Sequence, residues 1–131
     1  MIGKHQLGIY EKAFSPQSTW QEKLSAARRL GFDYVEISVD ESDERIERLY
    51  WTEENMEALR RCCVSEGVPI LSMCLSAHRR YPLGSANGAV REKAREIMER
   101  AIKFAVAMGI RTIQLAGYDV YYEASTPFTR E

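Results

Sequence analysis

One pattern recurs three times along this 131-residue chain. An apolar stripe at helical spacing ends at a glycine, and a run of alternating apolar residues begins shortly afterwards. The glycines are Gly31, Gly67 and Gly109. Glycine is the usual residue just past a helix because it adopts a positive φ without steric cost. Helices that lead straight into strands at intervals of about 40 residues are typical of (β/α) units. The repeat therefore predicts an α/β fold with a parallel sheet.

The same pattern sets the expected bounds of the elements. Strands are predicted at residues 6–12, 34–40, 70–76 and 110–117, and helices at residues 19–30, 52–66 and 90–108. Thr19 and Glu22 have the spacing of a capping box. The acidic run at residues 41–48 predicts a loop or short helix with solvated charges. Thr126 before Pro127 predicts the start of a further helix.

Each predicted strand has one apolar face and one polar face. Ile9, Ile37, Leu75 and Ile113 are expected to contact helices, and the opposite face is expected to gather Tyr10, Glu36, Ser38, His78 and Gln114. In the third strand, Leu71, Met73 and Leu75 alternate with small polar residues. Continuing that alternation beyond Leu75 places His78 on the polar face at the carboxyl end, where parallel α/β folds bind ligands.

Two architectures fit repeated (β/α) units, a doubly wound sheet and a barrel. The central strands of a doubly wound sheet are apolar on both faces, so the polar faces here favour the barrel. A complete (β/α)8 barrel needs about 200 residues or more. We therefore expect residues 1–131 to be a single partial domain, the N-terminal half of a TIM barrel with about four strands and three helices.

Composition excludes several classes of function. The chain has 18 basic and 19 acidic residues, so no net positive field favours nucleic acid or an anionic membrane. It has no run of about 18 apolar residues, and its polar start predicts no signal peptide, so a cytoplasmic location is expected. Cys62, Cys63 and Cys74 lack metal-ligand or redox spacing and are interpreted as reduced core thiols.

Four segments carry a resemblance to a known family. They are LGIYEKA at residues 7–13, the run around EISVDESDER, MCLSAHRRYPLGS at residues 73–85 and IRTIQLAGYDVYYE at residues 110–123. From about Gln6 to Glu123 the chain resembles the L-ribulose-5-phosphate/L-xylulose-5-phosphate 3-epimerases of pentulose and ascorbate catabolism. That family belongs to the xylose-isomerase-like barrels.

The resemblance implies a divalent metal, zinc or manganese, and an isomerase that removes the C3 proton of a pentulose 5-phosphate and returns it to the opposite face. The metal ligands and proton-transfer groups of the family lie on later strands, so no catalytic or metal-ligating residue is predicted here. This segment is expected to position substrate. Tyr10 would form a wall with a hydroxyl, Glu36, His78 and Gln114 would bind sugar hydroxyls, and Arg79 or Arg80 would bind phosphate.

Structural alternatives remain open for these residues. His78 is equally interpretable as a satisfied structural histidine, and each arginine as a solvated surface charge. A carboxylate in mid-strand is costly to bury without partners, which favours a site role for Glu36. Tyr118, Tyr121 and Tyr122 are interpreted as packing residues.

Three functions therefore remain in view. The first is a pentulose-5-phosphate 3-epimerase, of which this chain would be a truncated, inactive portion. The second is a non-catalytic half-barrel that assembles with another through its exposed edges, including a homo-oligomer. The third is a phosphodiesterase barrel related to AP endonucleases, which the scarcity of Lys and Arg at the strand exits argues against. The expected partner is a small sugar phosphate, with no nucleic acid and no membrane.

Overall fold

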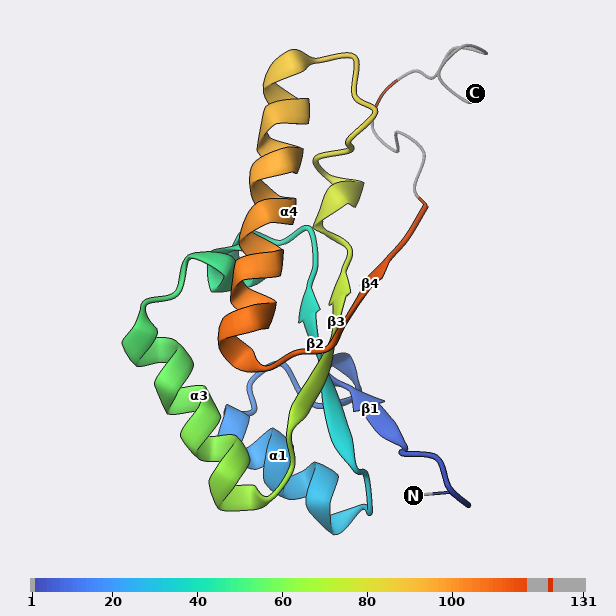
Figure 1. The fold of residues 1–131 in the computed structure, drawn as a ribbon, viewed down its shortest axis with the longest axis vertical. Coiled ribbons are helices and arrows are strands. Elements are labelled where there is room, and N and C mark those ends of the chain that lie inside the picture. The colour runs from blue at the N-terminus through green and yellow to red at the C-terminus, as the bar shows by residue number, and fades with distance from the viewer. Residues whose placement is uncertain (1, 118–122, 124–131) are drawn as a thin grey trace.

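Strands and helices alternate along the chain, as the repeat predicts (Figure 1). The structure is a computed structural model that describes residues 2–117 and Glu123. Its main elements are β1 (Gly8–Tyr10), α1 (Trp20–Arg29), β2 (Tyr34–Val39), α2 (Asp43–Glu47), α3 (Glu53–Glu66), β3 (Ile70–Leu75), α4 (Gly88–Met108) and β4 (Thr112–Leu115). Single turns of 3₁₀ helix follow β1, α2 and β3 as η1 (Glu11–Ala13), η2 (Arg48–Tyr50) and η3 (Ala77–Arg79).

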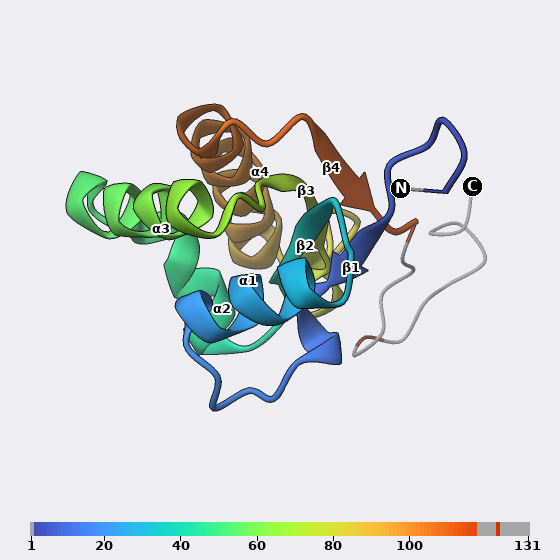
Figure 2. The same cartoon turned by 90° about the horizontal axis from the view of Figure 1, so that it is seen from below.

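The described strands form one parallel sheet in the order β1-β2-β3-β4. Strands that follow each other in sequence are therefore neighbours in space, as in a barrel wall. Figure 2 shows α1, α3 and α4 together on one side of the sheet, and within the described part of the chain no helix covers the other side. This one-sided layering confirms the partial (β/α) barrel and excludes the doubly wound alternative.

The hydrophobic core lies between the sheet and its helices. Fully buried members come from both layers, including Leu24, Ile37, Met73, Leu75 and Ile97. Burying each such side chain stabilises the fold by about 1.5–3 kcal/mol. Among the described residues, no helix is long and apolar enough to cross a membrane.

Several helix ends lie at the residues that their sequence signals predict, although α4 begins at Gly88, before the predicted residue 90, because Asn87 caps it. The Thr19 side chain accepts a hydrogen bond from the backbone N–H of Glu22, whose own side chain bonds back to Thr19, which completes the capping box. α3 and α4 end at Gly67 and Gly109, which have left-handed φ values of 69° and 71°. These caps turn the chain directly into β3 and β4.

The structure corrects three predictions of local detail. β1 ends at Tyr10, earlier than expected, because Glu11 turns into a 3₁₀ helix. A register shift at Val35/Glu36 pairs Val35 with Ile70, so Ile70 is buried and Leu71 only half-buried. The acidic run forms α2 and η2, and its Arg48 is buried rather than solvated. The helix predicted from Thr126 lies outside the described residues.

Candidate functional site on the inner face of the sheet

The inner face, defined as the side of the sheet opposite α1, α3 and α4, carries two rows of mostly polar side chains. Strand pairing aligns the first row across all the described strands and the second across β2, β3 and β4. The rows are Tyr10, Glu36, Ser72 and Thr112, then Ser38, Cys74 and Gln114. The predicted gathering of Tyr10, Glu36, Ser38 and Gln114 on one face is therefore confirmed, while their role in binding stays a prediction.

Two hydrogen bonds order this face. The Tyr10 hydroxyl lies 2.9 Å from Ser38 Oγ, and Ser72 Oγ donates to Glu36 Oε2 over 2.8 Å. Burial raises the pKa of Tyr10 to about 12, and the nearby Cys74 thiol adds to the rise while the Ser38 bond opposes it. Tyr10 therefore keeps its proton at neutral pH and remains both a donor and an acceptor. Gln114 is exposed and presents an amide beside them.

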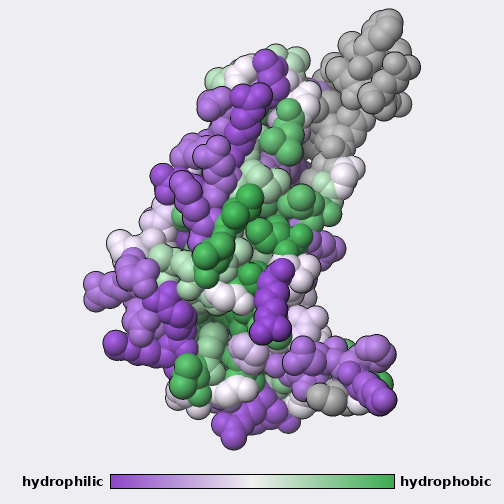
Figure 3. All heavy atoms as spheres, viewed as in Figure 1, coloured by the Kyte–Doolittle hydropathy of each residue, from purple (hydrophilic) through white to green (hydrophobic). Residues whose placement is uncertain are grey.

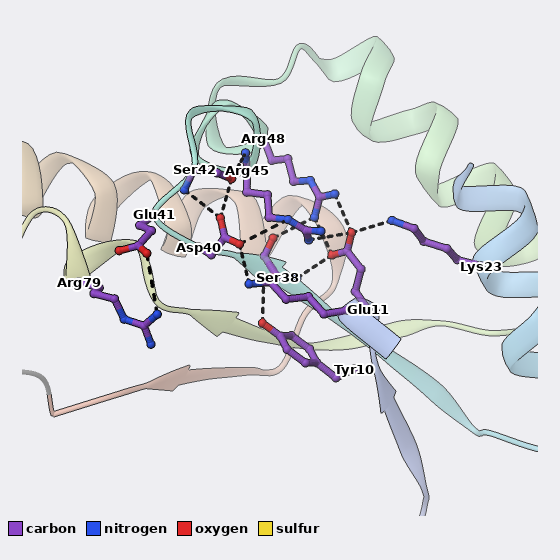
Figure 4. A network of polar contacts seen from close by, with 11 residues as sticks. Tyr10, Glu11, Lys23, Ser38, Asp40, Glu41, Ser42, Arg45, Arg48 and Arg79 are labelled. Atoms are coloured by element: carbon purple, nitrogen blue, oxygen red, sulfur yellow. Dashed lines mark hydrogen bonds and ion pairs between the residues drawn. The ribbon is translucent and has the colours of Figure 1, made fainter. Parts of the chain in front are cut away.

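Charged residues occupy the carboxyl ends of β2 and β3 (Figure 4). Burial alone would raise the pKa of Asp40, but bonds from Lys12 at 2.6 Å and from Ser42 lower it to about 2. Arg79 lies 3.9 Å from Glu41, so the loop after β3 is tied to the loop after β2.

A second arginine makes a similar contact. Arg80 Nη1 donates to Asp43 Oδ1 over 2.6 Å, and both side chains are substantially exposed. Exposed ion pairs of this kind contribute about 0–1 kcal/mol each. Such weakly held arginines can exchange their partners for another anion at little cost.

His78 does not join Glu36, so its predicted place on the polar face is wrong. The strand alternation stops at Leu75, and η3 rotates the His78 side chain toward α4. The residue is 7% exposed, and its Nε2 lies 3.0 Å from the Ala94 carbonyl oxygen. His78 is therefore a structural histidine with a satisfied hydrogen bond, the alternative interpretation that the sequence allowed.

A buried carboxylate, Glu11, was missed by the sequence analysis. It is 1% exposed and lies within 3.0 Å of nitrogen atoms from Lys23, Arg45 and Arg48 (Figure 4). One signal in the sequence could have identified Glu11 as a buried, paired carboxylate. The rule used for Glu36, that a carboxylate within a buried strand region needs partners, applies equally to an acidic residue directly after Tyr10.

The described residues do not fit a metal centre. Glu36 is bonded to Ser72, and Asp40 is held by Lys12 and Ser42. Within residues 2–117 and Glu123, no group of three or more His, Cys, Asp and Glu side chains could hold a metal ion. The described residues therefore supply no ligand set for zinc or manganese.

An apolar strip runs between α4 and β4 (Figure 3). It includes a cavity of about 210 Å³ lined by Leu75, His78, Met98 and Leu115, among others. Leu115 is 54% exposed although it points to the helix side of the sheet. The strip therefore lies on the opposite side of the sheet from Tyr10 and Glu36.

Comparisons with known proteins place this geometry in context. The family model described as "Xylose isomerase-like TIM barrel" matches residues 24–130. A curated relative from Escherichia coli, named L-ribulose-5-phosphate 3-epimerase UlaE, is 57% identical over 124 residues. The match covers 95% of this chain and 44% of that relative, so the chain spans less than half the length of such relatives.

Solved structures agree on the fold. A crystal structure of D-psicose 3-epimerase matches with a TM-score of 0.72 and 17% identity, over 95% of this chain and 43% of the other. The 3-keto-D-glucoside 4-epimerase YcjR from E. coli matches with a TM-score of 0.61 and 22% identity, over 84% of this chain and 37% of the other. At these identities the similarity concerns the fold alone.

Proposed function

Because the chain belongs to the xylose isomerase-like TIM barrel family, we propose that its inner face binds a pentulose 5-phosphate as the substrate-positioning part of a 3-epimerase. The observation that carries the proposal is the alignment of hydroxyl, carboxylate and amide groups on the side of the sheet without helices. The 57% identity to a relative named L-ribulose-5-phosphate 3-epimerase supports the choice of L-ribulose 5-phosphate and L-xylulose 5-phosphate.

Each inner-face residue has a role that its chemistry supports. Glu36 accepts hydrogen bonds from sugar hydroxyls, with Ser72 holding its carboxylate in place. Gln114 donates and accepts through one amide, and Tyr10 forms a rigid wall whose hydroxyl stays protonated. His78 is left out of this set because it is bonded to α4.

The phosphate of the substrate is assigned to the exit of β3. Arg79 and Arg80 stand there in ion pairs with Glu41 and Asp43. A phosphate dianion offers more charge and more acceptor oxygens than one carboxylate, so it competes well for either guanidinium.

Epimerisation at C3 requires removal of a proton next to the C2 ketone and its return on the opposite face. Two acid/base groups must therefore lie on opposite sides of the sugar. The described inner face is a single wall whose two rows hold one carboxylate, Glu36, and Asp40 at the end of β2 is held by Lys12 and Ser42, so no described residue is assigned an acid/base role. What this face contributes is orientation of the sugar.

The apolar strip favours a second candidate function, assembly with another half-barrel. Leu115 of β4 and Ile102 of α4 are about half exposed, and the outer edge of β4 is unpaired among the described strands. Nucleic acid is not part of either proposal, because the chain carries 18 basic and 19 acidic residues and therefore no net positive field that would attract a polyanion. We also propose a cytoplasmic location for the chain, which fits a phosphorylated substrate.

Calorimetric titration of the purified chain with L-xylulose 5-phosphate tests the proposed function. Glu36→Gln is expected to weaken binding roughly tenfold, the usual cost of one charged hydrogen bond. Arg61→Gln, on the exposed side of α3, is the matched control and should bind like the wild type. Absence of binding by the wild type, or equal affinity for both variants, would overturn the proposal.

A further inference from the structure

We propose that Glu11 is a positioning residue that fixes Ser38, and through it the Tyr10 hydroxyl, on the inner face. The claim concerns the face used in the proposed function, but the placement of these groups is a property of the chain and is testable without sugar. Glu11 itself points away from the inner face, into the contact between η1, α1 and η2 (Figure 4).

The Glu11 carboxylate is held by both of its oxygens. Arg48 donates through Nη1 to Oε2 over 2.6 Å and through Nη2 to Oε1 over 2.7 Å. Lys23 adds a third bond at 2.9 Å, and Arg45 Nη1 lies 3.0 Å from Oε1. A bidentate guanidinium pair fixes the direction of the carboxylate as well as its position.

Ser38 is held at each of its polar atoms. Its backbone N–H donates to Glu11 Oε2 over 2.8 Å, and its carbonyl oxygen accepts from Arg48 Nη1 over 2.9 Å. Its Oγ lies 2.9 Å from the Tyr10 hydroxyl. Glu11 and Arg48 therefore fix the backbone of β2 at the residue that carries the partner of Tyr10.

Glu11 also restrains Tyr10 directly, because the two residues are adjacent in the chain. Tyr10 is the residue directly before Glu11, and the two side chains leave the chain in different directions as β1 passes into η1. Anchoring the Glu11 side chain thus sets the end of β1, while Ser38 sets the matching point of β2. The Tyr10 ring is held from both strands.

Other roles for this cluster are weaker. The carboxylate is 1% exposed, and both of its oxygens are occupied by the partners named above. It therefore has little capacity to bind a ligand. Its cations are drawn from α1, α2 and η2, so the cluster ties the chain after β1 to the chain after β2.

The test compares the wild type with Glu11→Gln by NMR at neutral pH. In the Gln variant one oxygen becomes an NH₂, which faces donors in either orientation: Lys23 and Arg48 at the Oε1 position, or the Ser38 N–H and Arg48 at the Oε2 position. We expect the Ser38 amide to exchange with solvent roughly 100-fold faster and the nuclear Overhauser contact between the Tyr10 ring and Ser38 to disappear.

The control is Leu59→Ala, a cavity variant in α3 that lowers stability without touching this cluster. Should Glu11→Gln fail to fold, Arg48→Lys keeps the positive charge, removes the bidentate pair and is expected to show the same two changes. If Ser38 exchange and the Tyr10 contact match those of Leu59→Ala, the positioning role is overturned. Failure of the wild type to bind sugar would contradict the proposed function, but the Ser38 exchange rate and the Tyr10–Ser38 contact would still test the role of Glu11.

Discussion

At the scale of single residues, Glu11 is a buried group whose ionisation contributes to stability. Burial alone would raise its pKa, but bonds and charge from Arg48, with further bonds from Ser38 and Lys23, lower it from 4.5 to about 2. A lowered pKa means that the folded state binds the Glu11 proton less readily than the unfolded state does. The stabilisation is therefore complete above about pH 4.5 and is lost as the pH falls toward 2.

We expect the free energy of unfolding to fall by roughly 3 kcal/mol between these pH values on account of Glu11. Urea unfolding of the wild type at a series of acidic pH values measures this change. The control is Glu11→Gln, which has no carboxyl group at this position and should show a flatter pH dependence. Parallel curves for the two proteins would contradict the account.

The sequence predicted part of the site at this scale. Tyr10, Glu36, Ser38 and Gln114 were placed correctly because regular strand alternation decides the direction of a side chain. His78 was misplaced because it follows the last strand residue, where a 3₁₀ turn replaces the alternation. The partners of Glu11 come from positions 12 to 37 residues away, and no local pattern predicts such contacts.

At the scale of elements, positive-φ glycines set the junctions between helices and strands. Gly109 ends α4 at a φ of 71° and is followed closely by β4. We expect Gly109→Ala to lower the free energy of unfolding by about 1 kcal/mol, because a Cβ is disfavoured at this φ. Gly84→Ala is the control, since Gly84 is not among the positive-φ glycines and a Cβ there meets no atom within 4 Å. Equal unfolding midpoints for the two variants would show that the cap contributes nothing.

Most of the elements were predictable because their signals are local. Capping at Thr19 and the glycines at positions 67 and 109 mark helix ends by backbone geometry alone. The bulge between β2 and β3 was not predictable, because register depends on the packing of two segments far apart in sequence. The η2 turn was not predictable for a similar reason. It begins at Arg48, which is buried because it pairs with Glu11, a residue far away in sequence.

At the scale of the whole molecule, the two edges of the sheet decide how the chain behaves in solution. β1 and β4 are edge strands of the described sheet, and unpaired parallel edges are templates for association. We propose that the 131-residue chain self-associates through them. Light scattering over a range of concentrations should show dimers or larger species, and Leu115→Lys in β4 should reduce them. A concentration-independent monomer would contradict this.

The one-walled inner face also limits the chemistry of the chain. Two opposed acid/base groups are needed for C3 epimerisation, but the two inner-face rows hold one carboxylate, Glu36, and Asp40 at the end of β2 is held by Lys12 and Ser42. We therefore expect the chain, with zinc or manganese added, to exchange the C3 proton of L-xylulose 5-phosphate with deuterated solvent no faster than the protein-free reaction. Metal-dependent exchange above that rate would reveal a catalytic site beyond the residues described.

The most direct test of the central claim is to map where the sugar phosphate binds. Backbone and side-chain resonances of the chain would be followed by NMR as L-xylulose 5-phosphate is added, with inorganic phosphate in a parallel titration. The account predicts that the sugar phosphate shifts Tyr10, Ser38, Ser72 and Gln114, and that phosphate alone shifts only the neighbourhood of Arg79 and Arg80. Shifts confined to Met98, Ile102 and Leu115 on the helix side, with the inner face unchanged, would contradict it.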